Sequence, residues 1–128
     1  VLAVAAAKLG AGEVVAMDYD RTAATVAQEN VERNHVEDRV TTGVSDLLKA
    51  FTGKADRSIA NLIADSVSRL FDELDEQLAE GGHLLAAGII DERVADVTEA
   101  ALAHGFAIDK VIEENGWAAM VISRGDAK

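Results

Sequence analysis

The chain has 128 residues, 49% of them hydrophobic, which is the length of one domain and enough apolar material to bury a core. It contains no cysteine, which excludes a disulfide framework and a thiolate metal site and suits a reducing cytoplasm. The net charge is -11 and no cluster of lysine and arginine occurs, so a strong grip on a nucleic-acid backbone is not expected. A basic protein or a small molecule fits this charge better.

The first nine residues predict a buried helix. Four of them are alanine, Lys8 is in the last turn, and Gly10 follows as a left-handed C-cap. The apolar stretch is too short to cross a membrane and has no charged leading region. The predicted helix has an end but no N-cap and no preceding strand, so we expect residues upstream of it to be missing.

A strand is predicted next, over residues 14–17, because this short run is continuously apolar. The preceding Gly10-Ala11-Gly12 is read as a turn, since a dinucleotide loop would have to follow a strand and open a helix. Asp18 ends the strand. Its carboxylate is suited either to the two hydroxyls of a ribose or to an ordinary strand-end turn, and the spacing alone does not choose between them.

The following segment predicts a helix and then a second strand. Asp20 is a good N-cap for a helix over residues 21–34, and residues 40–44 are typical of a strand. The segment Ser45-Asp46-Leu47-Leu48 then starts a short helix that Gly53 closes. Asp46 could accept a hydrogen bond from an adenine amino group, or simply lie favourably at a helix N-terminus.

Asn61 is the residue around which the chemistry is expected. The segment of residues 56–65 is typical of a buried strand that stops at Asn61. At the carboxyl end of such a strand, an amide projects into the crevice where open α/β sheets bind ligands. The alternative is a plain strand-to-helix turn, with Ser66 as the N-cap of the next helix.

The segment after Ser66 predicts a helix, a strand and another helix. The first helix carries one apolar stripe and is expected to stop at Gly81-Gly82; the stripe consists of Val67, Leu70, Phe71, Leu74 and Leu78. Its acidic residues are read as a solvated face and not as a metal site. Residues 83–90 predict a strand, and Asp91 is expected to cap a helix over residues 92–104 that Gly105 ends.

The end of the chain breaks this alternation. Residues 106–113 and 117–124 are both strand-like, and Asn115-Gly116 between them supplies the positive φ angles of a tight reversal. The earlier alternation of strand and helix predicts a parallel sheet, and these last two strands must be antiparallel.

Several of these segments resemble the class I methyltransferases, and more closely the ribosomal protein L-eleven methyltransferase family (PrmA type). The similar segments lie at residues 1–11, 15–20, 60–65, 81–84, 88–90 and 116–118. The resemblance covers the chain almost end to end. It implies an α/β fold with a Rossmann-like, mostly parallel sheet, a terminal antiparallel hairpin and helices on both faces. Residues 1–128 would form a C-terminal methyltransferase domain that lacks its first strand, its glycine loop and the upstream substrate-recognition domain.

The resemblance also implies a site and a reaction. The cofactor would be S-adenosyl-L-methionine, with Asp18 on its ribose, Tyr19 beside the adenine and Asp46 at the adenine amino group. Asn61 would lie between the sulfonium and the substrate amine. The reaction implied is methyl transfer to amino groups of a large-subunit ribosomal protein in the cytoplasm, with no metal, membrane or direct nucleic-acid partner.

The chain departs from the family pattern in two respects, and three alternative functions are considered. The missing first strand would lie between the strands that end at Asp18 and Asn61, so residues 1–128 alone are not expected to be a competent enzyme. Arg57 and Ser58 stand where the family has apolar residues, so the strand would start late, near Ile59, or Arg57 would find an acid. The alternatives are a methyltransferase of nucleic-acid or small-molecule amines, an inactive nucleotide-binding fragment, and a nicotinamide dehydrogenase. The oligomeric state is not predicted.

Overall fold

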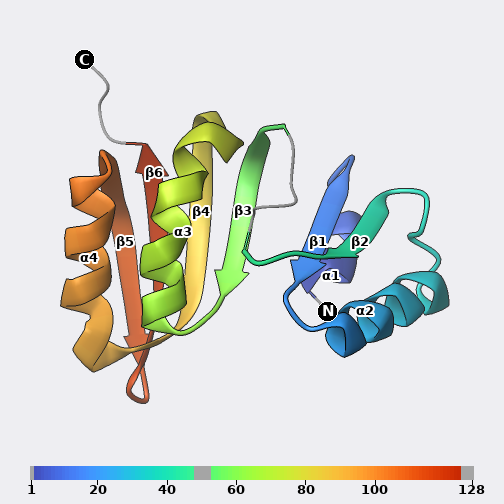
Figure 1. Ribbon diagram of the computed structural model, residues 1–128, viewed down its shortest axis with the longest axis horizontal. Coiled ribbons are helices and arrows are strands. Elements are labelled where there is room, and N and C mark those ends of the chain that lie inside the picture. The colour runs from blue at the N-terminus through green and yellow to red at the C-terminus, as the bar shows by residue number, and fades with distance from the viewer. Residues whose placement is uncertain (1, 48–52, 125–128) are drawn as a thin grey trace. The chain divides into compact units, whose positions relative to one another are not determined.

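The computed structural model describes residues 2–47 and 53–124. The chain divides into two compact units, residues 1–51 and residues 52–128. Each unit has its own sheet and its own helices (Figure 1). The two units are therefore described one after the other.

The first unit is a two-stranded parallel sheet with two helices. Its elements are α1 (Leu2–Lys8), β1 (Val14–Asp18), α2 (Arg21–Arg33) and β2 (Val40–Val44). The strands pair in register from Val14 opposite Val40 to Asp18 opposite Val44. Their carboxyl ends therefore lie at the same edge of the sheet, as predicted for consecutive parallel strands.

The helix boundaries of the first unit follow the predicted signals. Gly10 has φ +114°, and the amide of Ala11 donates to the carbonyl of Ala6 at 3.0 Å, which closes α1 in a left-handed turn. Asp20 is the N-cap of α2, and its carboxylate accepts from the amide of Thr22 at 3.0 Å. A small aliphatic core joins α1, α2 and β2; its buried members are Ala7, Val31, Val36 and Val40.

The second unit is a four-stranded mixed sheet with two α-helices. Its elements are β3 (Ala55–Asn61), α3 (Ala64–Gln77), β4 (Leu78–Ile90), a 3₁₀ turn (Asp91–Arg93), α4 (Val94–Ala103), β5 (Phe106–Glu114) and β6 (Trp117–Arg124). The strand order is β3-β4-β6-β5. Strands β3 and β4 are parallel, whereas β6 runs antiparallel to both β4 and β5. The predicted terminal antiparallel hairpin is confirmed.

The hairpin closes through the predicted two-residue turn. Asn115 has φ +54° and Gly116 has φ +84°, which are the positive angles that a tight hairpin of this twist requires. Because β6 inserts between β4 and β5, the hairpin forms the outer half of this sheet.

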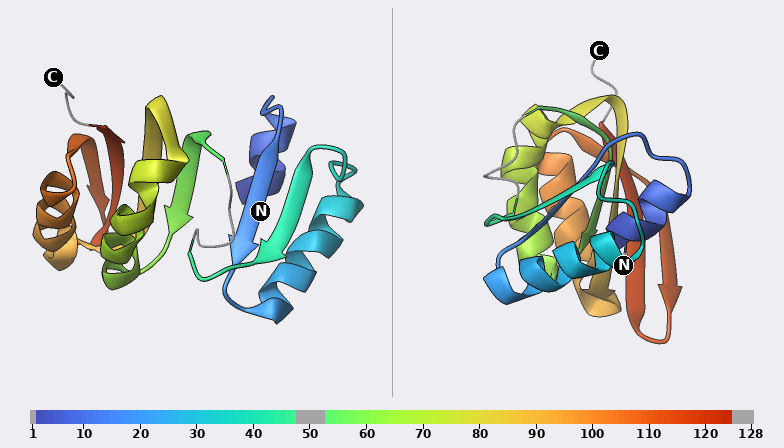
Figure 2. Two further views of the ribbon diagram at one scale, coloured as in Figure 1. Left: turned by 45° about the horizontal axis from the view of Figure 1, so that its top comes forward. Right: turned by 90° about the vertical axis from the view of Figure 1, so that its right-hand side faces the viewer.

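The core of the second unit lies between the sheet and its helices. Figure 2 shows α3 and α4 side by side over one face of the strands. The apolar stripe predicted for α3 is fully or almost fully buried, and Phe71 packs with its ring centroid 5.5 Å from that of Phe106. The largest buried side chains of this core are Phe71, Leu74, Leu78, Leu84, Ile89, Met120 and Ile122.

The predicted boundaries of α3 are wrong at both ends. The helix begins at Ala64 and not at Ser66, because Ile63 is the last extended residue and its carbonyl accepts from the amide of Val67. The helix ends at Gln77, before Gly81-Gly82, because Leu78 is extended and already pairs with Ala55 of β3. The glycines thus lie inside β4, which is longer than predicted.

Two further predictions need correction. Asp91 does not cap α4: it begins a 3₁₀ turn, α4 starts at Val94, and the Asp91 amide donates to the carbonyl of Gly116. Strand β3 does not start late, since it already begins at Ala55. Arg57 is nevertheless not a buried charge, because its side chain is exposed and donates to the carbonyl of Asp56 at 2.8 Å.

The short helix predicted from Ser45 to Gly53 lies largely outside the described residues. Within them, Asp46 is in a bend and Leu47 has φ +57°, so the segment leaves β2 through a turn. Strands β1 and β3 each pair with one neighbour among the described strands, and the expected further strand between them stays a prediction. No helix in the described parts of the chain is long and apolar enough to cross a membrane.

Candidate functional site

Asp18 ends β1 with its carboxylate fixed by the chain that follows. Its Oδ1 accepts from the amide of Asp20 at 2.9 Å, and its backbone carbonyl accepts from the amide of Ser45 at 2.9 Å. No other hydrogen bond reaches the Asp18 carboxylate from the described residues, and the residue is exposed. A carboxylate that is oriented by one local hydrogen bond and otherwise open can accept from a pair of hydroxyl groups.

Tyr19 and Asp46 lie at the same edge of the first unit's sheet. Tyr19 follows Asp18 and is 77% exposed, so its ring presents an open apolar face. Asp46 follows β2 two residues after Val44, which pairs with Asp18, and it is half-buried. The structure therefore brings three of the predicted site residues, Asp18, Tyr19 and Asp46, to one sheet edge.

Asn61 ends β3 in the second unit. It pairs with Ala87 of β4, and the amide of Leu62 donates to the Ala87 carbonyl at 3.0 Å. The Asn61 side chain is exposed and makes no hydrogen bond with the described residues. Its carbonyl oxygen and its two amide hydrogens therefore remain for a ligand, as the sequence predicts for a polar residue at a parallel strand end.

A small cavity opens at the turn after Asn61. It has a volume of about 130 Å³ and a largely apolar lining, formed by Ile63, Ala64, Asp65, Gly88, Ile90, Arg93 and Trp117. Ile63 and Trp117 are 67% and 55% exposed, so the cavity is open to solvent through apolar side chains. The lining also holds one ion pair, between Arg93 and Asp65.

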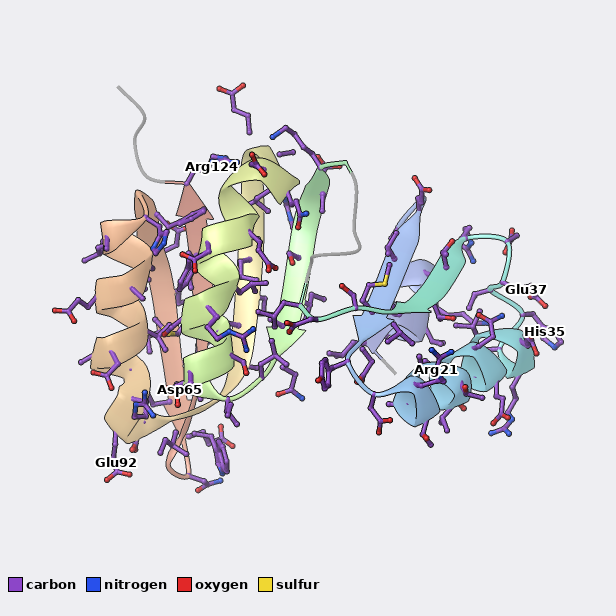
Figure 3. All side chains as sticks on the ribbon, in the orientation of Figure 1. Arg21, His35, Glu37, Asp65, Glu92 and Arg124 are labelled. Carbon is purple, nitrogen blue, oxygen red and sulfur yellow. The ribbon has the colours of Figure 1, made fainter. Side chains whose placement is uncertain are left out.

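Arg93 ties the two helices at this cavity together. Its guanidinium donates to the Asp65 carboxylate at 2.6 Å and to the Asp96 carboxylate at 2.7 Å. These hydrogen bonds, first to Asp65 and then to Asp96, raise the pKa of Arg93 above its ordinary value. Figure 3 shows Asp65 at the start of α3, facing the connection into α4. Arg93 therefore stays protonated and links the beginnings of α3 and α4.

Metal ligands do not gather in the described parts of the chain. No group of three or more histidine, aspartate, glutamate or cysteine side chains could hold a metal ion there. The arrangement instead offers carboxylates and an amide at strand ends, which are groups that bind by hydrogen bonding.

The Rossmann-like class I methyltransferase fold has parallel strands with polar residues at their carboxyl ends, and a terminal antiparallel hairpin. The chain shows these features. The crystal structure of a ribosomal protein L11 methylase from Lactobacillus delbrueckii subsp. bulgaricus superposes with a TM-score of 0.88 at 31% identity, covering 98% of this chain and 65% of that one. The Streptococcus pneumoniae protein Sp1610, a putative tRNA (m1A22) methyltransferase solved with S-adenosyl-L-methionine, shares the fold with a TM-score of 0.82 at 21% identity, covering 99% of this chain and 62% of that one.

The chain belongs to the family described as ribosomal protein L11 methyltransferase (PrmA), whose family model matches residues 1–125. A curated relative of that name from Pelotomaculum thermopropionicum is 46% identical over 120 residues, which are 94% of this chain and 39% of the relative. The chain thus spans about two fifths of the length of the curated relatives that it matches. The predicted family and fold class are confirmed.

The sequence did not single out Arg93, Gly88 or the role of Trp117 in the cavity. The partner Asp65 lies 28 residues before Arg93 in the chain, and Gly88 joins the cavity lining only in the folded unit, so no local pattern marks either residue. Residues 88–90 and 116–118 are among the segments that resemble the family, but the resemblance implied no role for them.

Proposed function

We propose that the protein is an S-adenosyl-L-methionine-dependent methyltransferase that transfers methyl groups to amino groups of a large-subunit ribosomal protein in the cytoplasm. The observation that carries this proposal is the family match over residues 1–125, which includes Asn61 at the carboxyl end of a parallel strand. The roles of the individual residues below rest on the geometry of each strand end.

The carboxylate of Asp18 fits the ribose of the cofactor. It is exposed at the end of β1, and one of its oxygens is already oriented by the amide of Asp20. Two ribose hydroxyls can donate to one carboxylate, which satisfies its acceptors without a cation. Asp18 would therefore bind the ribose of the cofactor and fix the orientation of the sugar.

Tyr19 and Asp46 would contact the adenine. The exposed ring of Tyr19 offers a stacking or edge contact, which a planar base favours. The Asp46 carboxylate could accept from the exocyclic amino group. Both residues lie at the sheet edge that Asp18 occupies, which supports one shared ligand for these three residues.

Asn61 would position the amine that receives the methyl group. When bound, S-adenosyl-L-methionine supplies an electrophilic methyl group on a sulfonium. Lysine has a reference pKa of about 10.4 and must lose a proton before it can attack. The amide oxygen of Asn61 can accept a hydrogen bond from the neutral amine and aim its lone pair.

In the transfer, the nitrogen–carbon bond forms as the sulfur–carbon bond breaks, the electron pair stays on sulfur, and the amine proton leaves to solvent. Orientation of the amine by Asn61 would supply much of the acceleration, because approximation alone can be worth several kcal/mol.

The charge of the chain supports a protein substrate over a nucleic acid. A net charge of -11 without a lysine and arginine cluster repels phosphates and attracts a basic protein. This charge would favour the approach of a ribosomal protein that is itself basic.

The test is methyl transfer from tritiated S-adenosyl-L-methionine by the protein expressed from its natural start codon. RNA-free large-subunit ribosomal proteins and, separately, ribosomal RNA and transfer RNA serve as acceptors. We expect label on protein amino groups, lost by about 100-fold in Asn61→Ala and retained in the matched variant Asn34→Ala. Label in RNA alone, or undiminished transfer by Asn61→Ala, would contradict the proposal.

A further inference from the structure

Gly88 touches the side chain of Asn61 from the neighbouring strand. Asn61 pairs with Ala87, and the amide of Leu62 donates a hydrogen bond to the Ala87 carbonyl. Gly88 comes next in β4. Gly88 therefore lies where the backbone of β4 passes the side-chain amide of Asn61.

The backbone of β4 is bent at this point. The pairing of β4 with β6 shifts register between Ala86 and Ile89, so Gly88 lies in an irregular stretch of the strand. Gly88 has φ +84°, an angle that residues with a side chain rarely adopt. Irregularities of this kind re-aim neighbouring groups and are common beside active sites.

The space at Gly88 is taken up by Asn61. A Cβ added to Gly88 would lie 2.6 Å from Asn61 Oδ1, 3.1 Å from the Leu62 carbonyl oxygen and 3.4 Å from the Leu62 nitrogen. The first distance is shorter than real carbon contacts allow. Any side chain at position 88 would therefore displace the Asn61 amide from where it now lies.

Two other glycines show that the close contact, and not the backbone angle, is special to Gly88. Gly105 and Gly116 also have φ +84°, but an added Cβ would meet nothing within 4 Å at either of them. The same backbone angle is thus compatible with open space elsewhere in this unit. At Gly88 an added side chain would meet the side chain of a neighbouring strand's residue.

We propose that Gly88 is a positioning residue for methyl transfer: because it has no side chain at the irregularity of β4, it leaves the space in which the amide of Asn61 takes the orientation that receives the substrate amine. The inference rests on the role proposed for Asn61 and extends it to the neighbouring strand. Gly88 does not touch the reacting atoms; it acts through the Asn61 amide and the Leu62 backbone.

Gly88→Ala and Gly105→Ala form a matched pair, because each adds one methyl group at φ +84° and only the first meets Asn61. Both are made in the protein expressed from its natural start codon, beside Asn61→Ala and the double variant Asn61→Ala/Gly88→Ala. The side-chain amide signals of Asn61, assigned by their loss in Asn61→Ala, are followed by NMR. We expect Gly88→Ala to shift these signals and Gly105→Ala to leave them in place.

The unfolding midpoint and the kinetics give two further readouts. Removal of the Asn61 amide makes room for the added methyl group, so Asn61→Ala should restore part of the midpoint lost in Gly88→Ala. We expect Gly88→Ala to lower kcat by about 100-fold, and the double variant to be no slower than Asn61→Ala. The midpoint cycle applies even if Gly88→Ala alone folds poorly.

Three results would overturn the inference: unshifted Asn61 signals in Gly88→Ala, additive losses of midpoint, or full kcat in Gly88→Ala where Asn61→Ala is slow. That last result would leave the proposed function standing. Full kcat in Asn61→Ala would instead overturn the role proposed for Asn61. It would also overturn the positioning role of Gly88, even if the NMR shift and the midpoint coupling show that residue 88 contacts Asn61.

Discussion

The two polar strand ends of the chain are held in different ways. In the first unit, the carboxylate of Asp18 is oriented by the amide of Asp20, two residues further along the same chain segment. In the second unit, the amide of Asn61 lies against Gly88, which belongs to a different strand. A local hydrogen bond orients the first group, and the packing of two strands orients the second.

The cores of the two units also differ, in the size of their side chains. The first unit is held by small aliphatic side chains such as Val31 and Val40. The second unit has a larger core in which Phe71 packs against Phe106 and His104. We infer that changes in the second unit's core cost more stability than equivalent changes in the first.

The largest effect is expected for Phe71→Ala. The ring is fully buried, so its removal leaves a cavity and should cost about 3–5 kcal/mol. Hydrogen exchange of the amides in β4 and β6 measures the loss, which should be confined to the second unit. Leu102→Ala is the control, because that side chain is 58% exposed. Equal effects of the two substitutions would contradict the account.

A smaller loss is expected for Val31→Ala in the first unit. Val31 is 1% exposed, and removing its two methyl groups should cost about 2 kcal/mol. Val26→Ala on the same helix serves as the control, since Val26 is 48% exposed. Amide protection in α2 and β2 should fall for Val31→Ala and hold for Val26→Ala. A loss as large as that of Phe71→Ala would remove the difference between the two cores.

The smallest effect is expected for Asp20→Ala. The carboxylate of Asp20 caps α2 through the amide of Thr22, and loss of such a cap costs about 1 kcal/mol. Asp20→Asn keeps an acceptor and should retain almost all of the stability. Protection of the first amides of α2 measures the change, and identical values for the two variants would show that the cap does not act as described.

Local signals in the sequence predicted much of this fold. The N-cap at Asp20 and the turn at Asn115-Gly116 were predicted because each depends on neighbouring residues alone. The ends of α3 were not, because Leu78 leaves the helix to pair with β3, an interaction that helix signals do not report. The glycines expected to end that helix lie inside β4 for the same reason.

The residues of the candidate site likewise fall into those that local sequence patterns predict and those that they do not. Asp18 and Asn61 follow from the rule that polar residues at parallel strand ends face a ligand crevice. Gly88 and Arg93 could not be predicted, because their importance depends on contacts with Asn61 and Asp65 that form only when the second unit folds. Their roles here come from geometry.

The most direct test of the account is calorimetric titration of S-adenosylhomocysteine into the protein expressed from its natural start codon. We predict binding that Asp18→Ala abolishes and that Asp38→Ala leaves unchanged, since Asp38 is an exposed carboxylate of the same unit away from the strand end. Equal affinity of the protein and its Asp18→Ala variant would contradict the assignment of this strand end to the ribose.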